Sequence, residues 1–234
     1  MINDKTPFGT KHAVDYFYKN RSKFKSLYNS EKKFLLQGIK NSFSFLDLGC
    51  GSGHFINIIK KYKKEFKYSG LDISPYQIEF AKKKYPEFEF IKIDRNFTKN
   101  LKKKFDLVFS FGVLHHSPSF LNLIKKMIIH SKKKIIFDLR LTNSKTLNNK
   151  STYQKIKFDN KKEFKGNKIN YIVVNYSFFL KKLLKITKKK YSIKIYYYKH
   201  SPAKSVNIEY NKVFMTSVFI DKTKKFKLSV ENIS

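Results

Sequence analysis

The most informative residues form a short run at 46–53, with the sequence LDLGCGSG. Glycines at alternate positions, Gly49, Gly51 and Gly53, let the chain turn sharply and let a ligand approach the backbone without Cβ atoms in the way. Asp47 precedes them and can accept hydrogen bonds from an ammonium group or ordered water. His54 stands where the dinucleotide fingerprint Gly-x-Gly-x-x-Gly needs its third glycine, which argues against a nicotinamide or flavin enzyme.

Two more carboxylates end later hydrophobic segments. Asp72 comes 19 residues after Gly53, and a carboxylate near that offset matches the two vicinal hydroxyls of a ribose. Asp94 closes the next segment, where it can accept a hydrogen bond from an exocyclic adenine amine. A single aspartate at the end of a strand is commonly a solvated turn residue. Three such aspartates at the ends of successive strands, the first beside a glycine loop, favour a nucleoside site.

The elements that must position these residues alternate in character. Short apolar runs at 43–48, 68–73, 88–93, 105–111 and 134–139 suit strands buried on both faces. Segments with helical spacing lie between them at 55–62, 76–85 and 120–129. This alternation predicts an α/β fold with a doubly wound sheet and helices on both faces. A helix at 176–186 and β-rich runs at 191–198 and 213–220 complete it, and the last dozen residues are expected to fray.

In these features the chain resembles the class I S-adenosylmethionine-dependent methyltransferases, over roughly residues 43–140. The resemblance implies a Rossmann-like, seven-stranded, mostly parallel sheet with an antiparallel C-terminal hairpin. It also implies S-adenosylmethionine as cofactor and S-adenosylhomocysteine as product. Residues 105–116 look like the family's fourth strand and the loop facing the methyl group, and residues 18–31 and 138–141 are similar to small bacterial methyltransferases that modify sugars. The implied cofactor-binding residues are Asp47, Gly49, Gly51 and Gly53 for the methionine part, Asp72 for the ribose, Ile73 and Asp94 for the adenine, and Phe111 in the fourth-strand loop.

Catalytic candidates are fewer. His115 and His116 lie in the fourth-strand loop, and imidazole titrates near neutrality, so either is a candidate general base, with His116 preferred. The alternative is that one packs against the sheet and the other caps the next helix. Arg21 is a candidate partner for the cofactor carboxylate or an acidic substrate, or is a surface charge. Arg140 would meet an anionic acceptor or merely neutralise Asp138.

The same pattern divides the chain. Residues 1–42 are expected to form an N-terminal helical cap or substrate lid, and residues 43–234 a class I methyltransferase domain. Residues 142–175 are polar and lack a clear period, so they are expected to be an insertion or loop that helps to build the acceptor pocket. No internal repeat occurs, and no pattern indicates an oligomeric state.

Composition excludes several classes of protein. The one cysteine, Cys50, rules out a disulfide framework, a cysteine-based zinc site and an iron–sulfur cluster, and no metal site is expected. No apolar stretch approaches the roughly 20 residues that span a bilayer, and the first residues lack the apolar core of a secretion signal. The sequence therefore predicts a cytoplasmic globular protein with no membrane span.

The net charge of +34 suggests a polyanionic partner, but its makeup argues otherwise. Only Arg21, Arg95 and Arg140 are arginines, although arginine grips phosphate best, and residues 1–140 and 141–234 carry the same net charge of +17. Abundant Lys, Asn, Ile, Phe and Tyr fit an AT-rich genome. Nucleic acid is thus a disfavoured partner.

The sequence also lacks the motifs of two subclasses of methyltransferase that act on nucleic acids. Residues 110–113 are Ser-Phe-Gly-Val, not the Asn/Asp-Pro-Pro-Tyr/Phe of base-amine methyltransferases, and Cys50 is not in the Pro-Cys of the cytosine-C5 type. The function we expect is methyl transfer to an oxygen or nitrogen of a small molecule or carbohydrate. The alternatives are an RNA methyltransferase, with tyrosines 196–198 stacking on bases, or a non-catalytic, cofactor-binding partner protein.

Overall fold

The computed structural model describes residue 8 and residues 11–95, 97, 101–156 and 168–233. Two parts of the predicted division therefore lie outside the described residues: 1–7 and 9–10 of the N-terminal cap, and 157–167 of the 142–175 segment.

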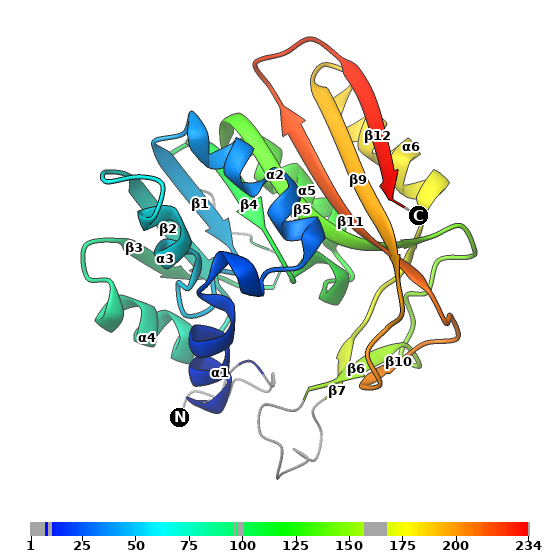
Figure 1. Ribbon diagram of the computed structural model, residues 1–234, viewed down its shortest axis with the longest axis horizontal. Coiled ribbons are helices and arrows are strands. Elements are labelled where there is room, and N and C mark those ends of the chain that lie inside the picture. The colour runs from blue at the N-terminus through cyan, green and yellow to red at the C-terminus, as the bar shows by residue number, and fades with distance from the viewer. Residues whose placement is uncertain (1–7, 9–10, 96, 98–100, 157–167, 234) are drawn as a thin grey trace.

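A nine-stranded sheet forms the centre of the molecule, in the order β12-β9-β11-β5-β4-β1-β2-β3, with β8 pairing beside β5 (Figure 1). Strand β11 runs antiparallel to both β5 and β9, and the remaining pairs are parallel. The strands are β1 (Ser44–Leu48), β2 (Lys67–Asp72), β3 (Glu89–Lys92), β4 (Phe105–Ser110), β5 (Ser131–Thr142), β8 (Val174–Asn175), β9 (Ser192–His200), β11 (Val213–Asp221) and β12 (Lys227–Ile233).

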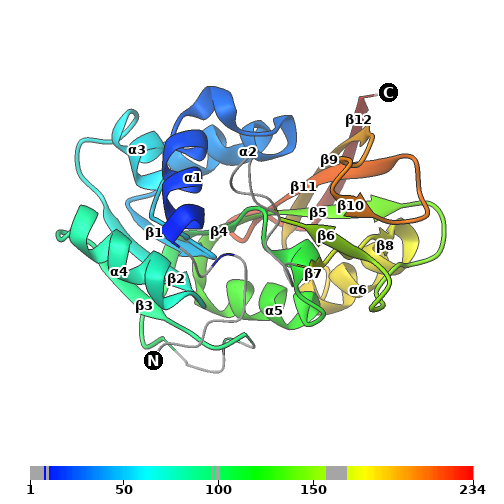
Figure 2. The same ribbon diagram turned by 90° about the horizontal axis from the view of Figure 1, so that it is seen from below.

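Helices cover both faces of this sheet, as Figure 2 shows with α2 and α3 on one side and α5 and α6 on the other. The helices are α1 (Lys11–Arg21), α2 (Asn29–Lys40), α3 (Phe55–Lys60), α4 (Pro75–Lys84), α5 (Phe120–His130) and α6 (Tyr176–Thr187), with short 3₁₀ turns η2 (Phe24–Ser26) and η3 (Leu114–His116). Apolar residues of α2, α3 and α4 form one core with the sheet, and those of α5 and α6 form another. The predicted doubly wound α/β class is confirmed.

Local sequence explains where the helices begin. Ser74 accepts a hydrogen bond from the backbone N–H of Gln77, and Pro75 stands at the first turn, where its missing N–H costs nothing. Asn175 accepts in the same way from the N–H of Phe178 at the start of α6. Asn175 is the last residue of β8 and Ser74 lies two residues after the end of β2, so each of these parallel strands passes almost at once into a helix.

A second sheet of three short antiparallel strands, β10-β6-β7, stands at the edge where the parallel strands end (Figures 1 and 2). Its strands are β6 (Tyr153–Lys155), β7 (Lys168–Asn170) and β10 (Val206–Asn207). Helix α1 stands at the same edge on the other side in Figure 1.

Two sequence expectations need correction. The main sheet has nine strands, not seven, because β8 and β12 join it. The final residues do not fray: residues 227–233 pair in parallel with β9. The described residues of 142–175, expected to be an insertion or loop, include the short strands β6, β7 and β8, whose backbone groups pair with other segments. Within the described part of the chain, no helix is long and apolar enough to cross a membrane.

Candidate active site

A cavity of about 800 Å³ opens at the carboxyl edge of the parallel strands. One end is formed by the glycine loop after β1 and by the ends of β2 and β3. The other is formed by the loop after β4, the end of β5 and the small sheet. The predicted site residues that line it are Arg21, Gly49, Gly51, Asp72, Ile73, Asp94, Phe111, His115 and His116, together with Arg140.

The glycine loop is held against the neighbouring strand. The N–H groups of Gly49 and Cys50 both donate to the carbonyl oxygen of Leu71, over 2.7 and 3.0 Å. Gly49 and Gly51 have φ values of +82° and +51°, a left-handed backbone that other residues adopt only with strain. The alternation of glycines therefore reflects the backbone geometry that turns the chain from β1 toward α3.

Asp72 receives two backbone hydrogen bonds at the end of β2. Its Oδ2 accepts from the N–H of Gly51 at 2.9 Å, and its Oδ1 accepts from the N–H of Ser74 at 2.8 Å. The loop and the acidic strand end are thus joined into one rigid unit.

Asp47 and Gly53 lie behind this unit and are not among the lining residues. The Asp47 side chain is buried and accepts a hydrogen bond from the Tyr68 hydroxyl at 2.6 Å. Its Oδ1 is buried with no hydrogen-bond partner among the described residues. Burial raises the pKa of Asp47 to about 8, with the Asp72 charge adding to the effect and the Tyr68 hydrogen bond opposing it.

The two histidines lie in η3, with ring centroids 3.9 Å apart. His116 Nδ1 is 2.7 Å from the carbonyl oxygen of Asn170, and because a carbonyl only accepts, Nδ1 carries the proton. The Nε2 atom of the neutral ring is then an acceptor. Burial lowers the pKa of His116 to about 4 despite that hydrogen bond, and lowers the pKa of His115 well below its usual value. Both rings are therefore neutral at pH 7.

Arg21 and Arg140, two of the three arginines that line the cavity, are paired with carboxylates. Arg21 forms an ion pair with Glu31, whose Oε2 also accepts from the N–H of Tyr28 at 2.8 Å. Arg140 Nη1 donates to Asp138 Oδ2 at 2.7 Å, and the other oxygen of Asp138 accepts from the N–H of Gly112, also at 2.7 Å. Arg140 thus pairs with Asp138 and also lines the cavity. The sequence had presented neutralisation of Asp138 and contact with an anionic acceptor as alternatives for this residue.

Several lining residues had no signal in the sequence. They come from α2, from the two sheets and from the loops after β7 and β9: Glu31, Gln154, Tyr171, His200, Ser205 and Met215. Apart from Glu31, each reaches the cavity because strands that are distant in the sequence pair. A charge search would have found Glu31, since it is the one acidic residue between Asp15 and Asp47.

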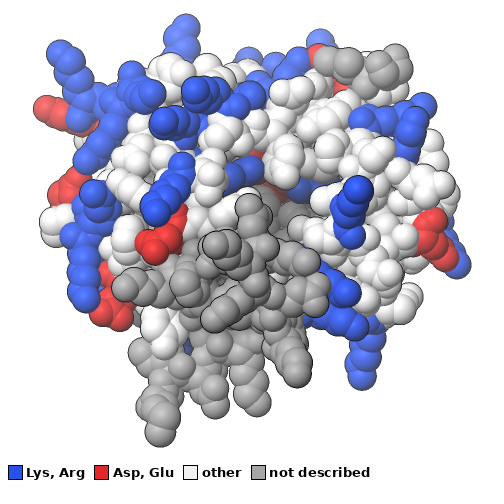
Figure 3. All heavy atoms as spheres, turned by 60° about the horizontal axis from the view of Figure 1, so that its bottom comes forward, with Lys and Arg blue, Asp and Glu red and all other residues white. Residues whose placement is uncertain are grey.

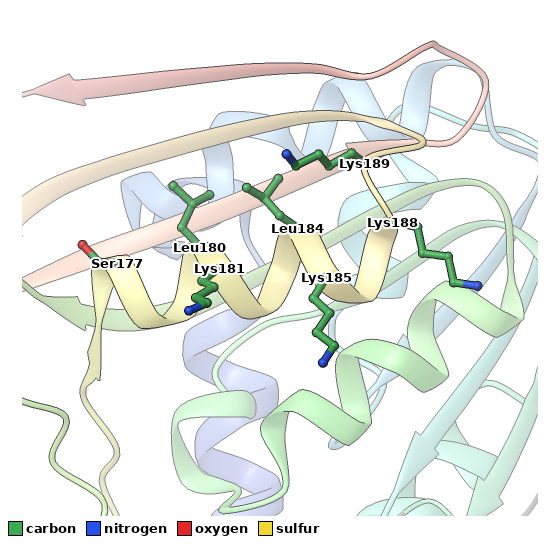
Figure 4. A pocket seen from close by; sticks show the side chains of 7 residues that line it. All are labelled: Ser177, Leu180, Lys181, Leu184, Lys185, Lys188 and Lys189. Carbon is green, nitrogen blue, oxygen red and sulfur yellow. The ribbon is translucent and has the colours of Figure 1, made fainter.

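A second hollow lies on α6, away from the glycine loop (Figure 4). Leu180 and Leu184 rise from one side of the helix, and Lys181 and Lys185 point away from the other. Its lining contains none of the predicted site residues, so it is not a candidate active site.

Comparison with known proteins agrees with this geometry. A family model described as "Methyltransferase domain" matches residues 39–197. The chain is 33% identical over 137 residues to a protein named as a methyltransferase, 235L of Invertebrate iridescent virus 6, covering 56% of this chain and 51% of the relative. It is 35% identical over 97 residues to malonyl-[acyl-carrier protein] O-methyltransferase 1 of Ilyobacter polytropus, covering 40% of this chain and 35% of the relative. The chain thus spans about half or less of the length of these relatives.

Among solved structures, the plantazolicin methyltransferase BpumL in complex with S-adenosylhomocysteine superimposes with a TM-score of 0.59. The superposition covers 94% of this chain and 91% of BpumL at 17% identity. At that identity the likeness concerns the fold, which is shared along nearly the whole chain.

Proposed function

This chain belongs to the methyltransferase-domain family, and from that premise we propose that it transfers a methyl group from S-adenosylmethionine to an oxygen or nitrogen of a small molecule or carbohydrate. One observation carries the proposal: a single cavity joins the glycine loop and Asp72 at one end to His116 and Arg140 at the other. Its volume of about 800 Å³ lies within the usual range for small-molecule sites, roughly 300–1,000 Å³.

The residues at the cofactor end fit such a nucleoside. The buried Oδ1 of Asp47, without a hydrogen-bond partner among the described residues, is a place for a bound water behind the loop. A Cβ on Gly51 would make only ordinary contacts of 3.7 Å or more, and one on Gly112 would meet no described atom within 4 Å, so a ligand can approach the backbone at both positions. Asp72 would hold the ribose, Ile73 and Asp94 the adenine, and the glycine loop the methionine part.

The bound cofactor supplies an activated methyl group on a neutral leaving group. The chain's own residues must position the acceptor and keep water away, since orientation accounts for much of the rate of a displacement. A hydroxyl or protonated amine must also lose a proton, and Nε2 of His116 is the atom that would take it. The relative named for O-methylation favours an oxygen acceptor.

The surface supports a small acceptor over RNA. On the face drawn in Figure 3, Lys and Arg lie at the top, left and right with acidic side chains among them, and the described side chains form no single basic groove there. Specific nucleic-acid sites concentrate their positive charge. RNA methylation therefore stays the second candidate.

Ligand-induced stabilisation tests the proposal. S-adenosylmethionine and S-adenosylhomocysteine at millimolar concentration should each raise the melting temperature by several degrees, because they bind only the folded chain. NAD⁺, which shares the adenosine part, is the control and should give a much smaller shift. If neither ligand stabilises the protein, the proposed function is wrong.

A further inference from the structure

The acceptor end of the cavity contains a buried arginine whose hydrogen-bonding capacity is only partly used. Arg140 of β5 is 5% exposed and lines the cavity. The hydrogen bonds of its guanidinium to Asp138 and to the Leu139 carbonyl both come from Nη1, and the Tyr171 hydroxyl contacts the same group. A guanidinium has five N–H donors, so part of this planar fork is left to face the cavity.

Apart from the carboxylate of Asp138, polar but uncharged groups lie beside Arg140. Burial and the charge of Arg140 lower the pKa of both His115 and His116, so neither imidazole carries a positive charge near pH 7. His115 is 4% exposed, lines the cavity, and has a buried Nδ1 with no hydrogen-bond partner among the described residues. Tyr171, also buried and lining, adds a phenol. Neutral hydrogen-bonding groups therefore lie next to the Arg140–Asp138 ion pair.

The balance of charge limits the kind of anion that fits. Asp138 is anchored through both oxygens, to Arg140 and to the Gly112 N–H, and Arg21 is paired with Glu31. Arg140 and Arg21 are thus each balanced by one carboxylate, so a singly charged anion upsets this local balance less than a dianion does. A carboxylate carries a single charge, and its two oxygens match the guanidinium fork.

We propose that Arg140, together with His115 and Tyr171, forms a subsite for a carboxylate group, and that the methyl acceptor is accordingly a carboxylic acid. This proposal rests on the proposed function, because it concerns the other end of the same cavity. The Gly112–Asp138–Arg140 chain of hydrogen bonds connects the subsite to the loop after β4, which fixes the position of the guanidinium relative to the glycine loop.

Binding of matched probes to the protein saturated with S-adenosylhomocysteine tests the subsite. Benzoate, benzyl alcohol and phenyl phosphate are compared, and octanoate with octan-1-ol, by NMR titration. We expect each acid to bind at least tenfold more tightly than its alcohol, and benzoate to bind more tightly than phenyl phosphate. Equal affinities for acid and alcohol, or tighter binding of the phosphate, would overturn the proposal.

Variants assign the preference to Arg140. Arg140→Gln should abolish the difference between acid and alcohol. The single variant leaves the buried charge of Asp138 unpaired, which can destabilise the fold. The double variant Asp138→Asn/Arg140→Gln removes both charges and gives the same test without an unpaired buried charge. Lys181→Gln, which removes an exposed cation of α6 outside this cavity, is the control and should keep the preference. A preference that survives the double variant contradicts the proposal.

The two proposals fail in different ways. If S-adenosylhomocysteine does not bind to the wild-type protein, the proposed function itself is contradicted. Normal binding of that ligand without any preference for acids contradicts only the carboxylate subsite.

Discussion

Asp72 is the side chain through which the glycine loop and the end of β2 act together. It accepts backbone hydrogen bonds from Gly51 and Ser74 and still faces the cavity. Replacing it by alanine removes a charged acceptor, so Asp72→Ala should weaken S-adenosylhomocysteine binding by about 2 kcal/mol, roughly 30-fold, in calorimetric titration. Glu65→Ala, an exposed carboxylate outside the cavity, should leave the affinity unchanged. Equal affinity in both variants would remove Asp72 from the site.

His54 gives a prediction about pH and stability. It is 7% exposed, and burial, with a smaller contribution from the Arg21 charge, lowers its pKa to about 3. An unfolded histidine titrates near 6.5, so between about pH 6.5 and 3 the unfolded chain binds more protons than the folded one. The stabilisation that neutral His54 gives is complete above pH 6.5 and is lost as the pH falls below it.

Urea unfolding at several pH values measures this effect. The stability difference between the wild type and His54→Gln should shift against the wild type by roughly 1.4 kcal/mol per pH unit between pH 6.5 and 5. The comparison with the variant removes the contribution of Asp47, whose raised pKa acts in the opposite direction. Lys64→Gln, on the surface, should run parallel to the wild type, and a parallel curve for His54→Gln would contradict the assigned pKa.

At the scale of elements, the small sheet β10-β6-β7 contributes lining residues to the cavity. The N–H of Lys155 in β6 donates to the Ser205 carbonyl at 2.8 Å. Lys155→Pro removes that donor, so hydrogen exchange should rise at residues 153, 154, 206 and 207 while β1 and β4 stay protected. The affinity for S-adenosylhomocysteine should change less than threefold. Lys155→Ala keeps the donor and is the control; exchange that rises equally in both variants would contradict the role of this hydrogen bond.

The parallel strands were predictable because each is an apolar run buried on both faces. Strand β4 is entirely buried, and the predicted 105–111 differs from it by one residue. Strand β12 was missed because it lies at the edge of the sheet and most of its side chains are exposed. Its only sequence signal is Leu228 and Val230 alternating with polar residues. This strand forms because its backbone pairs with that of β9, and no local sequence pattern predicts which strand will be its neighbour.

That Gly49, Gly51 and Asp72 line one cavity was predictable for a related reason. They lie at the ends of β1 and β2, and neighbouring parallel strands end at one edge of a sheet. The other end of the cavity was less predictable. Tyr171 meets Arg140 only because the small sheet returns to the loop after β4, where the N–H of Ile172 donates to the His115 carbonyl at 2.8 Å. Contacts of this kind depend on pairing between distant segments.

At the scale of the whole molecule, the net charge of +34 must have a measurable consequence even without a nucleic-acid site. Scattered lysines attract a polyanion through counterion release, which depends steeply on salt and carries no sequence information. The described Lys and Arg side chains form no single basic groove on the face drawn in Figure 3, so we expect this non-specific attraction and no more.

A salt titration with RNA therefore separates composition from function. A 20-nucleotide RNA should bind weakly at 20 mM NaCl, with a steep negative slope of log K against log salt, and should be released by 150 mM NaCl. Heparin, a polyanion without bases, should compete as effectively as RNA, and RNAs of different sequence should bind alike. Stacking on tyrosines 196–198 would instead leave a salt-resistant, base-dependent component. Sequence-selective RNA binding at 150 mM NaCl would make RNA the favoured acceptor. A site for a small molecule does not account for selection among RNA sequences.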